Sequence, residues 1–222
     1  MKAWFEKKTK TTGNGAVPLG DVIKPLRFQG DDNSLVVALK AKHPGAMEAL
    51  YDRYGAHVQR VLVRVLGFDF ELSDLLHEVF IEAFTNIDSI RDGSRLRAWM
   101  TTLAVYTARQ RIRRRSRRRV FWVHDETLVT DMPSKGTSHE EREALKLTYK
   151  VLDAMPVDER IPFTLRYIEG MDLGEVAESC DVSVSTIKRR LNRAQTRFTA
   201  IAYRQPVLKE WIERGDRWRV EQ

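Results

Sequence analysis

Apolar residues recur about every three to four positions in two separate stretches of this 222-residue chain. The first stretch covers residues 33–119 and the second covers residues 141–203. Neither contains strand-like alternation of useful length, and no repeat of fixed period is present. The periodicity predicts an all-α fold of two small helical domains.

The segments outside these stretches lack periodicity and divide the chain. Residues 1–32 mix Gly, Pro, Thr and Lys, which predicts a mostly disordered leader. Residues 120–140 contain DMPSKGTS, which predicts a flexible linker between the helical domains at 33–119 and 141–203. Residues 204–222 complete the chain as a short C-terminal tail.

The charge balance indicates the kind of partner. The net charge of +7 favours a polyanion, either nucleic acid or an anionic membrane surface. No apolar stretch is long enough to span a bilayer, and the lysines near the N-terminus are not followed by an apolar signal segment. We therefore expect a cytoplasmic protein that does not insert into membranes.

The sequence lacks the motifs that catalysis or metal binding would need. Gly-rich phosphate loops, nucleophile elbows and paired metal-ligand histidines are absent, and Cys180 is the single cysteine. Cys180 is expected to be a small buried apolar group. The sequence predicts a protein that is not an enzyme and that has neither a metal site nor a cofactor.

The segment MDLGEVAESCDVSVSTIKRRLNRAQTRFTAIA predicts two helices joined by a tight polar turn. Leu173, Val176 and Ala177 share one face of the first helix, which ends near Cys180. Ser183 is suited to cap the second helix. The apolar stripe of that second helix steps by four, three, four and three residues through Ile187, Leu191, Ala194, Phe198 and Ile201.

The opposite face of the second helix is polar and cationic. Arg and Asn can pair with base edges in the major groove, while Lys and hydroxyl groups hold phosphates. A solvated charged helix is the alternative interpretation. The predicted DNA-binding residues are Ser185, Thr186, Lys188, Arg189, Asn192, Arg193 and Arg197.

An acidic helix face is predicted in SDLLHEVFIEAFTNID, between Ser73 and Ile87. Acidic residues surrounding an isoleucine are unusual in a basic chain and indicate a basic docking partner. Ordinary solvation and compensation of the helix dipole are the alternative. The residues of this face are Asp74, His77, Glu78, Ile81 and Glu82.

Eight of the eleven residues from Arg109 to Arg119 are arginine. Such a block neutralises phosphates and gives DNA binding a steep salt dependence. A localisation signal or a solubilising run is the alternative. Trp99, on the helix that leads into this block, is expected to pack in the core.

These motifs resemble the extracytoplasmic-function sigma factors in order and in sequence. AMPVDERIPFTLRYIEGMDLGEVAESCDVSVSTIKRRLNRAQTRF is similar to sigma region 4, SDLLHEVFIEAFTNID to region 2.2, and SIRDGSRLRAWMTTLAVYTARQRIRRRSRRR to regions 2.3 and 2.4. The resemblance implies an alternative sigma factor that binds the clamp helices of the largest subunit of core RNA polymerase. It also implies binding to promoter DNA, double-stranded at the upstream element and single-stranded at the minus-ten element, and leaves an anti-sigma factor open as a further partner.

The resemblance also assigns roles to residues. The acidic helix face docks on the polymerase, and the cationic helix reads the upstream element. The loop SIRDGSRLR forms a pocket for a flipped base, and the arginine block holds the melted strand. The implied minus-ten residues are Asp88, Ser89, Arg91, Asp92, Ser94, Arg95, Arg109, Arg113, Arg114 and Arg117.

The chain departs from the family pattern at two positions. Asp181 replaces the usual turn glycine, and Asp tolerates the left-handed conformation better than most residues. Pro162 replaces an aliphatic residue inside a helix and removes one backbone donor; if Asp158 caps that helix, Pro162 sits near the first turn, where the loss is mild. A helix-turn-helix regulator that acts without being a polymerase subunit is the alternative function.

Overall fold

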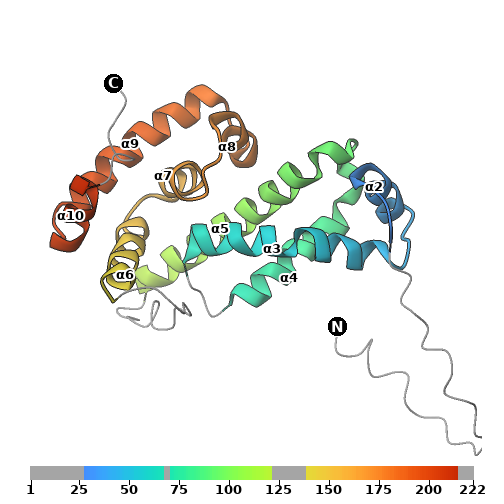
Figure 1. The fold of residues 1–222 in the computed structure, drawn as a ribbon, viewed down its shortest axis with the longest axis horizontal. Helices are drawn as coiled ribbons and strands as arrows, with labels where there is room; N and C mark the ends of the chain where they lie inside the picture. Colours follow the sequence, from blue (N-terminus) through green and yellow to red (C-terminus); the bar gives the residue numbers. More distant parts are fainter. Residues whose placement is uncertain (1–27, 68–70, 122–138, 215–222) are drawn as a thin grey trace, which may run out of the picture.

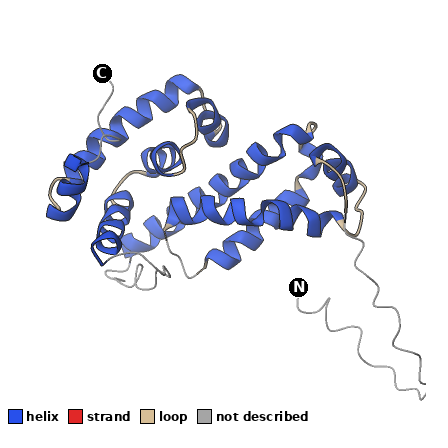
Figure 2. Ribbon diagram, viewed as in Figure 1, coloured by secondary structure: helices blue, strands red, loops and turns tan. Residues whose placement is uncertain are grey.

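The computed structural model describes residues 28–67, 71–121 and 139–214, which form helices connected by turns (Figures 1 and 2). No strand occurs within these described ranges, so the predicted all-α fold is confirmed. Most of the predicted leader and of the predicted linker lies outside the described residues.

The N-terminal half is built on two long helices that run side by side, α3 (Ala46–Leu66) and α5 (Leu96–Phe121), with α4 (Leu72–Thr85) packed against both (Figure 1). The short helix α2 (Asp32–Lys40) packs on α3. Asp31 caps α2 because its carboxylate accepts a hydrogen bond from the backbone of the first turn.

Two short 3-10 turns, η2 (Ile87–Ser89) and η3 (Gly93–Arg95), connect α4 to α5. Gly93 lies directly on the start of α2, and its N–H donates to Asn33 Oδ1 at 2.8 Å. A Cβ at Gly93 would lie 2.4 Å from the Asn33 nitrogen, so only glycine fits there. Lys40 Nζ also donates to the Ile90 carbonyl at 2.6 Å. The loop that carries the predicted base pocket is therefore held on α2.

The C-terminal half is a second group of helices, in which α6 packs on α9 and α10, and α7 and α8 pack on α9. The terminal helix α10 was predicted only as part of a tail, but its Leu208 is buried. The elements are α6 (His139–Asp153), α7 (Val157–Phe163), the π-helical turn η4 (Thr164–Ile168), α8 (Leu173–Cys180), α9 (Val184–Ala202) and α10 (Pro206–Arg214).

Pro162 is not in the first turn of its helix. Helix α7 begins at Val157, directly after Pro156, so Asp158 lies inside the helix and does not cap it. Pro162 lacks the N–H that would bond back along the helix, and the π-helical turn η4 begins two residues later. The predicted cap at Asp158, which would have placed Pro162 near the first turn of the helix, is therefore wrong.

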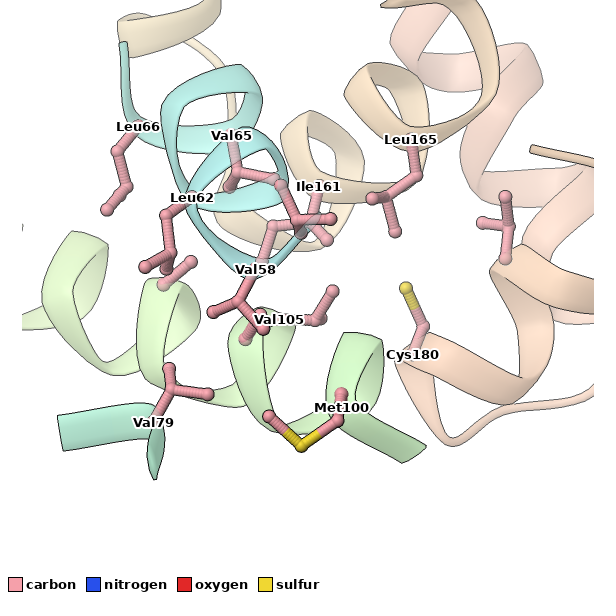
Figure 3. Close-up of a cluster of buried hydrophobic side chains, with 14 of the residues drawn as sticks. Val58, Leu62, Val65, Leu66, Val79, Met100, Val105, Ile161, Leu165 and Cys180 are labelled. Carbon is pink, nitrogen blue, oxygen red and sulfur yellow. The ribbon is translucent and has the colours of Figure 1, made fainter. Parts of the chain in front are cut away.

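The two halves share one hydrophobic core, which the sequence did not predict. Helices α7 and α8 pack on α5, and η4 packs on α3. In Figure 3, Val58 and Val105 from the N-terminal half lie beside Ile161 and Cys180 from the C-terminal half, and all four are buried. The described helices thus form one packed unit across the predicted linker.

Candidate nucleic-acid interface

Helix α8 and the turn after it have the predicted helix-turn-helix geometry. Asp172 caps α8 by accepting a hydrogen bond from the Glu175 backbone N–H, and the Glu175 carboxylate accepts one from the Asp172 backbone N–H; both contacts are 2.8 Å. The helix ends at Asp181, which has φ 54° and ψ 51°. Asp181 thus takes the left-handed conformation for which the family normally uses glycine.

Helix α9 is positioned by its cap and by its apolar stripe. Ser183 Oγ accepts a hydrogen bond from the Thr186 backbone N–H at 3.3 Å. Ile201 is only partly buried, and Ala202 takes its place as the last fully buried residue. The other predicted members of the stripe, Ile187, Leu191, Ala194 and Phe198, are buried.

The predicted reading face of α9 is turned outward, with two qualifications. Thr186 is half-buried, and its hydroxyl lies 2.9 Å from the Ser183 hydroxyl. Arg197 Nε lies 2.7 Å from the carboxylate of the buried Glu159, so Arg197 already has an anionic partner. The remaining predicted residues, Ser185, Lys188, Arg189, Asn192 and Arg193, are exposed.

A pocket of about 280 Å³ lies where the base pocket is predicted. The backbone N–H of Ser94 donates to the Asp92 carboxylate at 2.9 Å, and hydrogen bonds from Ser94 lower the pKa of Asp92. Asp88 and Ser94 are exposed but do not line the pocket. The lining residues are Ser89, Ile90, Arg91, Asp92, Arg95, Trp99, Thr102 and Glu178.

Two residues that line the pocket, Trp99 and Glu178, were not predicted to do so. Trp99 was assigned to the core, but it is only partly buried and also lines the pocket, where an aromatic ring can stack on a base. Glu178 belongs to α8, and its carboxylate forms an ion pair with Arg95. No sequence pattern brings Glu178 to this loop, whereas Trp99 lies four residues after Arg95, about one helical turn, and this spacing is a signal that could have placed it at the pocket.

The arginine block is partly exposed and partly engaged. Arg113 and Arg114 are exposed. Arg109 is partly buried, and its Nη2 lies 3.4 Å from the Cys180 carbonyl oxygen. Arg111 pairs with Glu71 at 2.6 Å. The side chain of Arg117, also predicted to bind DNA, lies outside the described residues.

The acidic face of α4 is largely exposed. Asp74, His77 and Glu78 are open to solvent, and Ile81 is 51% exposed although it is a large aliphatic residue. Glu82 is half-buried, and its carboxylate accepts a hydrogen bond from Asn86 Nδ2 at 2.9 Å. The face thus combines exposed acids with one exposed apolar side chain.

Cys180 is 2% exposed, and burial raises the pKa of its thiol to about 11. A thiol in this state is unreactive near neutral pH. Among the described helices, none is long and apolar enough to cross a bilayer.

Comparison with known proteins identifies the family. The chain matches Sigma-70 region 2 over residues 50–118 and Sigma-70, region 4 over residues 142–197. It is 34% identical over 131 residues to the ECF RNA polymerase sigma factor EcfG of Rhodopseudomonas palustris, which covers 59% of this chain and 70% of that protein. It is 26% identical over 173 residues to the ECF RNA polymerase sigma-E factor of Escherichia coli K12, covering 74% and 90% respectively.

Two solved structures share the fold. One is CnrH in complex with the cytosolic domain of CnrY, with a TM-score of 0.55 and 21% identity over 78% of this chain and 98% of that chain. The other is the sigma factor RpoE in complex with the anti-sigma factor NepR from Bartonella quintana, with a TM-score of 0.52 and 22% identity over 78% and 96%. The chain belongs to the extracytoplasmic-function sigma factors of the sigma-70 family and is an alternative sigma factor that directs transcription initiation.

Proposed function

We propose that three surfaces of this chain divide the work of promoter-specific initiation. The acidic face of α4 docks on the clamp helices of the largest subunit of core RNA polymerase. The outward face of α9 reads the double-stranded upstream element. The pocket before α5, with the arginines that follow it, holds the single-stranded minus-ten element.

The observation that carries this proposal is the separation of charge among exposed surfaces. Asp74 and Glu78 face solvent beside Ile81 on α4, whereas Lys188 and Arg189 face solvent on α9. DNA repels the first surface and attracts the second. A chain that carries both kinds of surface is suited to bind a protein and DNA at once, whereas a regulator that acts alone needs only the second.

The geometry of α9 supports base readout by its early turns. Ser183 caps the helix, so the helix begins at a defined residue and presents Lys188 and Arg189 about one turn later. Recognition helices contact base edges chiefly with their N-terminal residues. Arg197 forms an ion pair with Glu159 at 2.7 Å. This pair gives Arg197 a structural role, in addition to any contact that Arg197 makes with a phosphate.

Three further features complete the proposal. The protein acts without catalysis, because the surfaces of the described residues are suited to bind and position DNA and offer no arranged acid, base or nucleophile. It works in the cytoplasm, where core polymerase and the chromosome are found. An anti-sigma factor is a proposed inhibitor, since CnrH and the Bartonella quintana RpoE are each described in complex with another protein, in the second case an anti-sigma factor.

Reconstitution with core RNA polymerase tests the function. Transcripts made from genomic fragments by core polymerase plus the protein are mapped, and a gel shift on the resulting promoters is run with and without core. We expect new start sites that require the protein, and specific binding that requires core. Specific binding by the protein alone, with no new start sites, would instead identify a helix-turn-helix regulator.

A further inference from the structure

We propose that helix α2 sets the base preference of the minus-ten pocket, and that Asn33 and Lys40 are the positioning residues through which it does so. The inference rests on the proposed function of the pocket. It adds two residues that do not line the described pocket and that act on it through the backbone of its loop.

The loop between α4 and α5 lies against α2, and Figure 1 shows α2 beside the start of α5. Two side chains of α2 bond to the backbone of this loop. Asn33 Oδ1 accepts a hydrogen bond from the Gly93 N–H at 2.8 Å. Lys40 Nζ donates one to the Ile90 carbonyl at 2.6 Å. The loop is therefore held on one helix at two separate positions.

The backbone between these two hydrogen bonds is extended. Ile90 has φ −83° and ψ 129°, and Asp92 has φ −125° and ψ 115°. Three extended residues cover about 10 Å. Asn33 and Lys40 are seven positions apart, which corresponds to about 10.5 Å along a helix. The two lengths are similar, so the loop can lie along α2 with both hydrogen bonds made at once.

Two charged residues of the pocket lie between the bonded positions. Arg91 and Asp92 are exposed and line the pocket. A flipped base is read by hydrogen bonds to its edge, and a hydrogen bond weakens steeply when its donor and acceptor move out of line. The position of the backbone at these two residues therefore determines which base edges they can bind.

Helix α2 is a firm support because it is fixed to α3. The Asp32 carboxylate accepts hydrogen bonds from Arg53 Nη1 and from the Tyr54 hydroxyl, both at 2.5 Å. Arg53 Nη2 also donates to the Gly30 carbonyl at 2.8 Å, and Leu35 of α2 is fully buried. Loss of one hydrogen bond to the loop should thus shift the loop and leave α2 in place.

A role in base preference predicts a result that a role in stability does not. Protein that is partly unfolded initiates less often at every promoter, so the ratio between favoured and disfavoured bases stays the same. A loop that shifts on α2 changes this ratio, because each base then meets differently placed donors and acceptors. The ratio is therefore the quantity to measure.

Transcription by core RNA polymerase with the full-length protein, from a promoter library randomised in the minus-ten element, measures this ratio. Asn33→Ala removes the acceptor for the Gly93 N–H, and Lys40→Met removes the donor to the Ile90 carbonyl. Each should lower the preference for the favoured base by about two- to tenfold, the equivalent of one hydrogen bond. Base preference in a library randomised in the upstream element should not change.

Two further variants serve as controls. Lys42→Met removes the same charge from an exposed side chain two positions away and should keep the wild-type ratio. Lys40→Arg keeps both a charge and a donor and should restore most of the preference that Lys40→Met loses. An equal loss in Lys42→Met and Lys40→Met would show that net charge, and not the bond to the loop, is responsible, and would overturn the proposal.

The remaining outcomes separate this inference from the function on which it rests. If Asn33→Ala and Lys40→Met initiate less often but keep the wild-type ratio, α2 only stabilises the fold, and the inference is wrong while the pocket keeps its proposed function. If the wild-type protein itself has no base preference in the minus-ten element, the proposed function of the pocket fails and the positioning role fails with it.

Discussion

Tyr149 on α6 donates its hydroxyl hydrogen to the backbone carbonyl of Val63 on α3, 3.1 Å away, across 86 positions of sequence. Its ring also covers Gly67, the residue that ends α3 with φ 79°. One side chain thus fixes the end of a helix in the other half of the molecule. The first prediction follows from this contact.

Gly67→Ala should destabilise the protein more than Gly170→Ala. Both glycines have positive φ, 79° and 82°, and Gly67, with ψ −164°, lies in a region that essentially only glycine adopts, so an alanine there costs about 1–3 kcal/mol of backbone strain. At Gly67 the added Cβ would also lie 3.1 Å from the Tyr149 ring, whereas at Gly170 it meets nothing within 4 Å. Urea unfolding of both variants measures the difference.

Removing the ring should reduce the cost of Gly67→Ala. In a Tyr149→Ala background, Gly67→Ala retains the backbone strain and loses the contribution of the contact with the ring. If Gly67→Ala costs the same with and without Tyr149, the close contact between Gly67 and the ring carries no energy.

The stability of the protein should fall as pH drops from about 6.5 toward 4, in part because of His57. Burial, with Arg97 and Arg60 nearby, lowers the pKa of His57 to about 4. The unfolded chain binds a proton below pH 6.5 while the folded chain does not, so stability declines as pH falls through this window. His57 lies 2.7 Å from the Thr101 hydroxyl, between α3 and α5.

His57→Gln provides the test, since glutamine keeps a hydrogen-bonding group and does not titrate. The urea midpoint of the variant should depend less on pH between 6.5 and 4 than that of wild type. Parallel curves for the two proteins would show that carboxylates alone set the acid sensitivity.

Asp74→Arg combined with Glu78→Arg should weaken binding to core polymerase without unfolding the domain. Both side chains are exposed on α4, so their reversal disturbs the proposed docking face and leaves the core intact. Fluorescence titration with core polymerase measures the affinity. The control is Glu143→Arg combined with Glu213→Arg, which makes the same change of charge on α6 and α10. Equal affinity of the two double variants would remove α4 from the docking surface.

Arg113→Gln combined with Arg114→Gln should flatten the salt dependence of single-stranded DNA binding. Each phosphate contact that is lost should reduce the slope of log affinity against log salt by about 0.7. Arg204→Gln combined with Lys209→Gln removes the same charge from the exposed surface near the C-terminal end. A slope that changes equally in both double variants would indicate general attraction and no site at the arginine block.

Arg189→Ala should lower transcription from the preferred promoter by the equivalent of about 1–3 kcal/mol and relax the choice of base at one upstream position. Arg189 is exposed about one turn into α9, where recognition helices usually contact base edges. Arg193→Ala, one turn further along, should weaken all promoters alike. Transcription from a library randomised in the upstream element separates the two; a uniform loss for Arg189→Ala would mean that the assigned register of α9 is wrong.

Sequence reasoning succeeded where the cause is local. The cap at Ser183, the left-handed Asp181 and the buried side of α9 each depend on residues within a few positions of one another. Exposure of Asp74 and Arg189 follows from the same helical periodicity. These features are set by backbone preferences and by the spacing of apolar residues, which a single sequence displays directly.

Contacts between the two halves could not be predicted, because they join residues that are far apart in the sequence. Tyr149 and Arg160 bind carbonyls of α3, and backbone carbonyls are identical at every position, so no sequence pattern marks them as partners. From the sequence alone, Glu178 is indistinguishable from any other solvated acid on a short helix. Only the fold places it beside Arg95. Trp99 fits the apolar stripe and yet also lines the pocket.

The shared core of Figure 3 links the stability of the two halves. Ile161 and Cys180 are packed against Val58 and Val105, so removing apolar atoms at any of these positions leaves a cavity that faces both halves. A substitution in the C-terminal half is therefore expected to destabilise the helices of the N-terminal half as well.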